Sequence, residues 1–474
     1  MRIYYIASLC ALLTGCGGSG NSKPSTVAPA APLNLAINVG DGAISLGWNP
    51  PASDGGAAVD SYEVTLNPAV PTSAITFSGT GALVGNLSNG TAYTVSVRAR
   101  NRVGAGQAVS ASVVPRAITT AGYSPITIQG DDSPSGVYDP SILRLTSGEL
   151  WLSYSSVNYY NNANSQLVQD VGIRLAYSAD GGNTFTYSKT IAAPTDSTVT
   201  DTDPARSACG AATCSGRWVY ETSWLIDDST DPDPARRFKL FAHKYFLNPA
   251  GTARTLYHLG SIVMWTASAP DQTWSAETSL LGWFLTPPEL VPAQVVNSLH
   301  ADLANCIVVA EGSATVRDGS IDLVFACTYP GGDPLPQKIV MLRSADHLDS
   351  LQYVSTLLTP ADAVPIGASF FSAPALMASP GSAPALLVTP SFSGVYAGCV
   401  VIPLADPAGG TLFRANNLPV GILYTPPIQG HFGGACTYSA GLGNNGILQS
   451  DGAAGTSPAE AQFKIQATQA VLQP

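Results

Sequence analysis

The chain has 474 residues, of which 11% are charged, 46 are glycine and 36 are proline. Its length is sufficient for two or three domains, and its composition is typical of short strands joined by turns rather than of long charged helices. The formal net charge of −11 is spread thinly along a sequence without a basic cluster. This excludes nucleic acid as a partner, because nothing is available to neutralise phosphates.

The N-terminus has the pattern of a targeting segment. Arg2 precedes the apolar run 3–13, and LTGC (13–16) matches the bacterial lipobox, in which Cys16 is the residue acylated after cleavage. We therefore predict a signal peptide over 1–15 and a lipidated Cys16 with a flexible tether over 16–31. The protein is then exported and lipid-anchored at the outer membrane or cell surface. An ordinary secretory signal with a chance cysteine is the alternative.

Six cysteines follow this segment, and an even number in an exported chain predicts disulfides. Zinc is the alternative, but the sequence has no Cys-x-x-Cys and its histidines are not suitably spaced. The simplest connectivity joins sequence neighbours: Cys209 with Cys214, Cys306 with Cys327, and Cys399 with Cys436.

Residues 32–117 alternate in the manner of short strands and contain no cysteine. In AYTVSVRA, for example, Tyr93, Val95, Val97 and Ala99 share one face of a predicted strand. The segment resembles a fibronectin type III domain over nearly its whole length. This resemblance implies a sandwich that is stable without disulfides and acts as a spacer or a weak glycan contact. The residues that carry it are Trp48, Pro50, Pro51, Tyr62, Leu87, Tyr93, Asn101 and Gly104.

Residues 120–474 show a longer repeat. Each unit begins with a run that predicts an inner strand, and most continue into strands rich in β-branched and aromatic residues, as four-stranded propeller blades do. The fold class we predict is all-β, with a fibronectin type III-like sandwich followed by a five-bladed β-propeller. A sixth blade requires the last unit to be split. The units begin with VYDPSILRL (137), WVYETSWLI (218), CIVVAEGSA (306), SFFSAPALM (369) and GHFGGACTY (430).

One turn of the first unit, SADGGNTF (178–185), fits the Asp-box pattern Ser-x-Asp-x-Gly-x-Thr-Trp/Phe of sialidases and related propellers. Gly181 and Gly182 allow a tight turn with positive φ, and Ser178 and Asp180 can hydrogen-bond its backbone. Phe185 can pack beneath it. The motif therefore predicts a structural hairpin on the outer rim of the first blade and says little about substrate.

Ligands bind on the axis of a propeller, where the first strand of each blade presents its side chains. The five predicted inner strands carry Asp139, Glu221, Glu311, no acidic residue in the fourth, and His431. Clustered carboxylates raise one another's pKa. Glycoside cleavage needs such a pair, one carboxyl to protonate the leaving oxygen and another to activate water.

These motifs resemble those of family 43 glycoside hydrolases. The resemblance implies that Asp139, in the Asp-Pro of the first blade, is the general base and that Glu311 is the general acid. Glu221 takes the position that tunes the acid, and His431 that of an axial histidine near which a calcium ion can bind; no other cofactor is predicted. Glu221 replaces the usual Asp, and Ser313 the usual Pro. The implied mechanism is inverting, with the acid and base carboxyls roughly 6.5–9.5 Å apart.

Each of these residues also has a structural interpretation, such as a strand cap for Asp139 or a turn residue for Glu311. Aromatic side chains can stack on sugars. We assign His431 and Trp224 to substrate binding. Trp265, Trp283 and Phe284 can also stack on sugar rings, and the alternative for all four aromatic residues is packing between blades.

The leading hypothesis is a monomeric, surface-anchored glycoside hydrolase that acts on polysaccharide or oligosaccharide. The first alternative is a non-catalytic carbohydrate-binding or adhesion lipoprotein. The second is a sialidase-like enzyme, which needs three arginines on the axis; the candidates are Arg144, Arg174 and Arg343.

Overall fold

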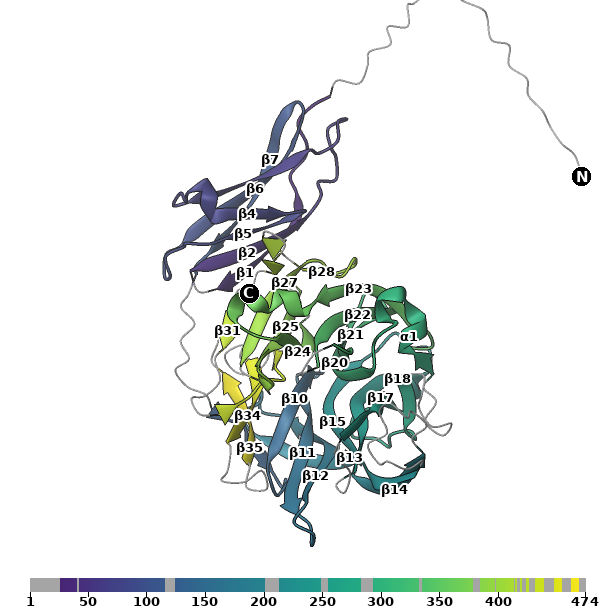
Figure 1. The fold of residues 1–474 in the computed structure, drawn as a ribbon. Coiled ribbons are helices and arrows are strands. Elements are labelled where there is room, and N and C mark those ends of the chain that lie inside the picture. The colour runs from purple at the N-terminus through teal and green to yellow at the C-terminus, as the bar shows by residue number, and fades with distance from the viewer. Residues whose placement is uncertain are drawn as a thin grey trace, which may run out of the picture.

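The computed structural model describes residues 26–40, 42–115, 124–200, 213–248, 255–282, 293–331, 335–377, 384–396, 398–412, 414–415, 418–419, 423–425, 431–438, 447–453 and 462–468. Strands dominate these residues, and Figure 1 shows them in a small sandwich beside a larger ring of sheets. The predicted all-β class is confirmed. None of the helices in these ranges is long and apolar enough to cross a membrane. The targeting segment and Cys16 lie outside the described residues.

The N-terminal sandwich has two sheets. Its four-stranded sheet has the order β1 (Leu33–Gly40), β2 (Ala43–Asn49), β5 (Gly81–Val84), β4 (Ile75–Ser78), and η1 (Thr72–Ala74) precedes β4. The three-stranded sheet has the order β3 (Ser61–Asn67), β6 (Tyr93–Asn101), β7 (Gly104–Val113).

The period-2 pattern of β6 places alternate residues in the core of this sandwich. Trp48 packs against Tyr62 with ring centroids 5.2 Å apart. The Tyr93 hydroxyl accepts a hydrogen bond of 3.1 Å from the Ser88 backbone N–H, which ties the start of β6 to the preceding turn. Asn101 donates to the carbonyls of Val27 and Asp54, so its amide fixes the end of the same strand.

The first two blades of the ring contain its longest strands. Blade 1 has the order β10 (Val137–Arg144), β11 (Leu150–Asn161), β12 (Leu167–Ser178), β13 (Phe185–Ala192), β9 (Ile128–Gln129). Blade 2 has the order β14 (Thr195–Thr200), β15 (Thr213–Asp227), β16 (Phe238–Leu247), β17 (Thr255–Ala267), β18 (Thr278–Gly282), β19 (Gln294–Val295).

Blades 3 and 4 are built from shorter strands. Blade 3 has the order β20 (Val308–Arg317), β21 (Ser320–Thr328), β22 (Gln337–Ser344), β23 (Gln352–Leu358). Blade 4 has the order β24 (Phe370–Met377), β25 (Ala385–Phe392), β27 (Cys399–Asp406), β28 (Thr411–Leu412), with β26 (Val395–Tyr396) on β25 and β31 (Leu423–Thr425) on β27.

Blade 5 closes the ring. It pairs β34 (Ile447–Ala453) with β32 (His431–Phe432), β33 (Thr437–Tyr438) and β35 (Gln462–Thr468). Its outer strand is β8 (Ser124–Pro125), which pairs with β35, so both ends of the ring domain share one sheet. The inner strands β10, β15, β20, β24 and β33 contact one another in this cyclic order. Each predicted inner-strand segment overlaps one of them, and the predicted β-propeller of five blades is observed.

Short elements complete the connections. Beside η1 they are α1 (Val296–Leu299), η2 (Pro234–Arg236), η4 (Ala301–Leu303), η5 (Pro360–Asp362), η6 (Val364–Ile366) and the hairpin β29 (Arg414–Ala415), β30 (Leu418–Pro419). β29 contacts β4 of the sandwich, which places blade 4 next to the N-terminal domain (Figure 1).

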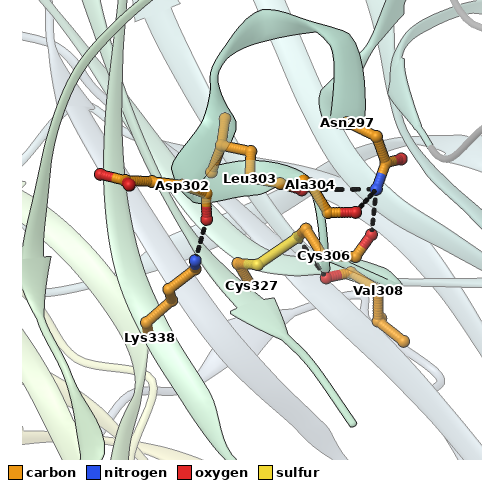
Figure 2. Close-up of a disulfide and its surroundings, with 8 residues drawn as sticks. All are labelled: Asn297, Asp302, Leu303, Ala304, Cys306, Val308, Cys327 and Lys338. Atoms are coloured by element: carbon orange, nitrogen blue, oxygen red, sulfur yellow. Dashed lines mark hydrogen bonds between the residues drawn. A yellow bond between two sulfur atoms is a disulfide. The ribbon is translucent and has the colours of Figure 1, made fainter.

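Two of the predicted disulfides are confirmed. Cys306–Cys327 joins the entry of β20 to β21, and Figure 2 shows Asn297 of α1 donating to three carbonyls of the loop that carries Cys306. Cys399–Cys436 joins β27 of blade 4 to the inner segment of blade 5 and therefore links two neighbouring blades. Cys214 is disulfide-bonded, but Cys209 lies outside the described residues.

The SADGGNTF turn joins β12 to β13. Asp180 accepts from the Ser178 hydroxyl at 2.7 Å and from the Thr184 backbone and hydroxyl at 3.0 and 2.7 Å. Blade 3 repeats this pattern between β22 and β23, where Asp346 accepts from Ser344 and from the backbone and hydroxyl of Ser350. The two turns occupy the same place in their blades, which supports a structural role.

Candidate active site on the propeller axis

The inner strands of blades 1 to 4 are interrupted at the same place by a β-bulge. In blades 1 to 4 two residues oppose one residue of the second strand, and one of the two has a left-handed backbone. Positive φ in a residue other than glycine costs about 1–3 kcal/mol and is concentrated at functional sites. The five left-handed residues are Asp139 (φ 52°), Thr222 (47°), Glu311 (46°), Ala373 (45°) and Ala435 (48°). Two of the three predicted site carboxylates therefore occupy equivalent positions in their blades.

The backbone N–H groups of these bulges donate hydrogen bonds to side chains of the neighbouring blade. Thr222 donates to the Asp139 carboxylate at 3.1 Å, and Ala373 donates to the Glu311 carboxylate at 3.2 Å. Asp139 in turn donates through its own N–H to the Ser450 hydroxyl of blade 5 at 2.8 Å. The carboxylates of Asp139 and Glu311 thus accept hydrogen bonds from the left-handed backbone of the next blade.

Asp139 is 7% exposed and lies at the junction of blades 1 and 2. Its Oδ2 accepts from the Thr222 N–H and hydroxyl, each at 3.1 Å, and from the Ser155 hydroxyl at 3.3 Å. Burial raises the pKa of Asp139 well above its usual range, and the charges of Glu221 and Glu311 raise it further. The donors from Thr222 act in the opposite direction.

Glu311 lies at the junction of blades 3 and 4. Its Oε2 contacts the Ser372 hydroxyl and accepts from the Ala373 N–H, and the Tyr396 hydroxyl donates to Oε1 at 3.2 Å. Burial raises the pKa of Glu311, and Glu221 adds to this effect, whereas Ser372, His243 and Tyr396 oppose it. The residue after Glu311 is glycine, because a Cβ at position 312 would lie 2.7 Å from the Trp224 ring.

Glu221 sits one residue before the bulge of blade 2, and its longer side chain lies among aromatic neighbours. Oε2 accepts from the hydroxyls of Tyr245 at 2.8 Å and Tyr138 at 3.3 Å, and Oε1 is 3.3 Å from His243 Nδ1. Burial, with smaller contributions from Tyr159 and Glu221, raises the pKa of Tyr138 well above its usual range, so Tyr138 stays a donor. Glu221 raises the pKa of both other carboxylates, Asp139 and Glu311.

A small cavity of about 30 Å³ lies between the left-handed residues of the five blades, and Asp139 is among the residues that line it. Pro140, Gly312, Pro374 and Cys436, which follow four of the left-handed residues, also line it. A space of this size holds water rather than a sugar ring.

Trp224, which was predicted to bind substrate, lies outside the carboxylate cluster. Trp224 is 3% exposed, and its ring lies 5.7 Å from that of Phe241, so no face is open to a sugar. Trp224 packs between blades 2 and 3 instead, and Trp265 is likewise buried against Tyr220. His431 belongs to β32 and pairs with Ala453 of β34. Trp283 and Phe284 lie outside the described residues.

The three candidate arginines do not meet on the axis. Arg144 donates to the Gly148 carbonyl in a turn, Arg174 pairs with Asp131 and Asp132, and Arg343 pairs with Asp322. Each is engaged in a different part of blade 1 or blade 3. This arrangement does not form the carboxylate-binding triad of a sialidase.

Several site residues were missed in the sequence: Tyr138, His243, Tyr245, Ser372 and Tyr396. His243 pairs directly with Glu221 across β15 and β16, so the register of the predicted hairpin contained the signal for it. Tyr396 carries no such signal, because it comes from the short extra strand β26.

A group with the composition of a metal site lies elsewhere, in and near the β15–β16 connection. Asp228, Asp231 and His347 bring their ligand atoms together among the described residues. The fully buried Lys239 ammonium lies 2.8 Å from both carboxylates, so a protein cation already compensates their charge.

Comparison with known families addresses the N-terminal domain. The family model described as "Fibronectin type III domain" matches residues 30–116. Residues 30–116 are a fibronectin type III domain. The two sheets, the buried Trp48 and the Tyr93 hydrogen bond agree with this assignment.

Solved structures similar to the chain include glycosidases. A thermostable family-43 glycoside hydrolase is 11% identical, covering 72% of this chain and 91% of its own, with a TM-score of 0.42. A family 117 glycoside hydrolase from the marine bacterium Zobellia galactanivorans is 12% identical over 74% of this chain and 90% of its own, with a TM-score of 0.41. The Hadza microbial sialidase Hz136 is 12% identical over 90% of this chain and 86% of its own, with a TM-score of 0.38. The sheet order and the ring of contacts between inner strands define the propeller independently of these structures.

Proposed function

We propose that the propeller is a glycoside hydrolase that cleaves polysaccharide or oligosaccharide with its axial carboxylates. The observation that carries this proposal is the meeting of Asp139, Glu221 and Glu311 from three successive blades, with the pKa values of Asp139 and Glu311 both raised. Such a cluster retains a proton where isolated carboxyls have lost theirs. A site that holds both a carboxylic acid and a carboxylate can supply an acid and a base together.

In the proposed reaction Glu311 gives its proton to the leaving glycosidic oxygen. Asp139 takes a proton from the water that attacks the anomeric carbon on the opposite side of the sugar, so one water is consumed and the configuration inverts. Burial and the charges of Glu221 and Glu311 raise the pKa of Asp139, and the hydrogen bonds from the backbone and hydroxyl of Thr222 oppose this rise, so they favour the ionised form that a base requires. Glu221, held by Tyr138, Tyr245 and His243, raises the pKa of the acid.

The charges of the site favour an uncharged sugar. Hydroxyls, backbone amides and His243 are the donors recorded for the three carboxylates among the described residues. Three acidic groups would repel the carboxylate of a sialic acid, and the candidate arginines are engaged elsewhere. We therefore prefer a neutral glycan to a sialoside.

The test is a screen of the purified ectodomain against aryl arabinosides, xylosides, galactosides and a sialoside, with Glu311→Gln and Asp139→Asn as matched variants. Hydrolysis of a neutral glycoside whose leaving oxygen must be protonated, lost in both variants, supports the proposal. Activity that survives both substitutions contradicts the assigned roles. Retained glycan binding without turnover on any substrate identifies the carbohydrate-binding, adhesion alternative.

The proposal includes a location. With Cys16 acylated, the fibronectin type III domain stands between a lipid anchor and the propeller, which places the site at the outer membrane or cell surface. The targeting pattern of the first 16 residues supports this. Metabolic labelling with a radioactive fatty acid tests it, because Cys16→Ser loses the label if the anchor is real and a wild-type protein without label contradicts it.

A further inference from the structure

The Ser372 hydroxyl has more hydrogen-bond acceptors around it than it can serve. It contacts Glu311 Oε2 and lies 2.6 Å from the side-chain carbonyl oxygen of Gln337. A serine hydroxyl carries one hydrogen, so it can donate to only one of these two oxygens at a time. The other contact must be made by a hydrogen that belongs to the partner.

Gln337 presents its Oε1, which carries no hydrogen, to Ser372. If the Ser372 hydrogen points to Gln337, the hydrogen between Ser372 and Glu311 must be carried by Glu311; if it points to Glu311, the Gln337 amide must turn its NH₂ group toward Ser372. The Tyr396 hydroxyl lies 3.2 Å from the other oxygen, Oε1, of Glu311, and 3.3 Å from both Glu311 Oε2 and Ser372 Oγ, so its single hydrogen can go to Oε1. When Glu311 is a neutral carboxylic acid, the Ser372–Glu311, Ser372–Gln337 and Tyr396–Glu311 contacts each contain one hydrogen.

We propose that Gln337, acting through Ser372, is a positioning residue that holds Glu311 in its protonated form. When Glu311 ionises, the Gln337 amide turns its NH₂ group toward Ser372, and the Ser372 hydrogen turns to the carboxylate. The orientation of Gln337 and the protonation of Glu311 are thereby coupled. This inference rests on the proposed function in one respect: the proton that Glu311 retains is the one it donates to the leaving oxygen.

The packing around Glu311 is compatible with this coupling. Ser372 is fully buried in β24, and Gln337 begins β22 in the same blade as Glu311. The charged or titratable groups that act on Glu311 from other elements are Glu221 of β15, His243 of β16, Asp139 of β10 and Tyr396 of β26. Burial and Glu221 favour the neutral acid, whereas His243 and Tyr396 favour the anion, so one additional hydrogen bond can shift the balance.

The test measures the protonation of Glu311 directly and needs no substrate. The ectodomain is labelled with [5-¹³C]glutamate, and the side-chain carboxyl signals of its few glutamates are followed from pH 4 to pH 9 by NMR. The signal missing in Glu311→Gln identifies Glu311. The Gln337→Leu variant frees the Ser372 hydrogen for the carboxylate, so the pKa of Glu311 should fall by roughly one pH unit, about the effect of one hydrogen bond to a charged group.

Two variants with the opposite expected sign and one control make the result specific. Tyr396→Phe and Ser372→Ala remove donors to the anion, so each should raise the pKa of Glu311, the opposite sign to Gln337→Leu. Gln352→Leu, an exposed change in β23 of the same blade, should leave it unchanged. If Gln337→Leu does not fold, Gln337→Met removes the same acceptor at similar volume.

A Gln337 variant that folds and leaves the pKa of Glu311 unchanged or higher overturns the inference. The proposed function fails separately: if these titrations behave as expected but no glycoside is hydrolysed, the coupling stands and the catalytic assignment does not.

Discussion

The two domains bury polar groups in different ways. The core of the fibronectin type III domain is built from aliphatic residues around Trp48, and its polar anchors, such as Asn101, bond to backbone in turns. The propeller buries carboxylates at its centre, on backbone that is left-handed at every inner strand, and links two of its blades with a disulfide. The first arrangement stabilises the domain. The second accepts local strain and buried charge at one place, which is typical of a site that performs chemistry.

The largest effect should come from the axial acid. Glu311→Gln removes the proton donor, so kcat/KM for a substrate with a sugar leaving group should fall by about 10²–10⁴-fold. A dinitrophenyl glycoside, whose leaving group needs no proton, should lose far less. Steady-state rates on the two substrates measure the difference. Equal losses on both would mean that Glu311 is not the acid.

The next largest effect concerns the core of the fibronectin type III domain. Trp48→Ala should destabilise the fibronectin type III domain by about 3–5 kcal/mol, because it removes a buried indole from the core. Calorimetry should show one transition moving while the propeller transition and the activity are retained. Loss of activity would show that the sandwich supports the site, through contacts such as that of β4 with β29.

Removing the disulfide between blades 4 and 5 should have a smaller effect. The double change Cys399→Ala and Cys436→Ala should lower the free energy of unfolding by about 2–4 kcal/mol. Denaturant titration monitored by tryptophan fluorescence measures it. Cys306→Ala with Cys327→Ala, which opens a link within blade 3, is the matched control, and we expect only the first pair to loosen the closure of the ring.

The smallest effect concerns the turn of blade 1. The hydrogen bonds from the Thr184 backbone and hydroxyl lower the pKa of Asp180 to about 2. Its unfolded value is about 3.9, so its contribution to stability is present above that pH and is lost as the pH falls toward 2. The melting temperatures of wild type and Asp180→Asn should therefore differ near pH 6 and converge in acid.

Asp346→Asn in the equivalent turn of blade 3 should behave in the same way, because hydrogen bonds from the Ser350 hydroxyl and backbone also lower the pKa of Asp346. A difference in melting temperature that stays constant with pH would contradict this account of either turn.

Much of the fold was predictable from the sequence. Alternation placed Tyr93, Val95 and Val97 in a core, and the five inner strands began with recognisable runs, so Asp139, Glu221 and Glu311 could be placed near one axis. The bulges could not be placed, because the residues with left-handed backbone have no shared chemistry: Asp139 and Ala435 occupy equivalent positions.

The prediction for Trp224 as a sugar-binding residue was wrong for the same reason. The bulge at Thr222 shifts the residues after it relative to the second strand, and Trp224 points between blades instead of into the site. The network of Gln337, Ser372 and Tyr396 depends on contacts between strands far apart in sequence, which no local pattern shows.

The central claim is that Asp139 and Glu311 act as one catalytic unit, and a double-mutant cycle tests it most directly. We predict that kcat/KM for a neutral glycoside falls by a similar large factor in Asp139→Asn, in Glu311→Gln and in the double variant, since residues that act together are strongly non-additive. Independent losses that multiply in the double variant, or activity retained in all three proteins, would contradict the account.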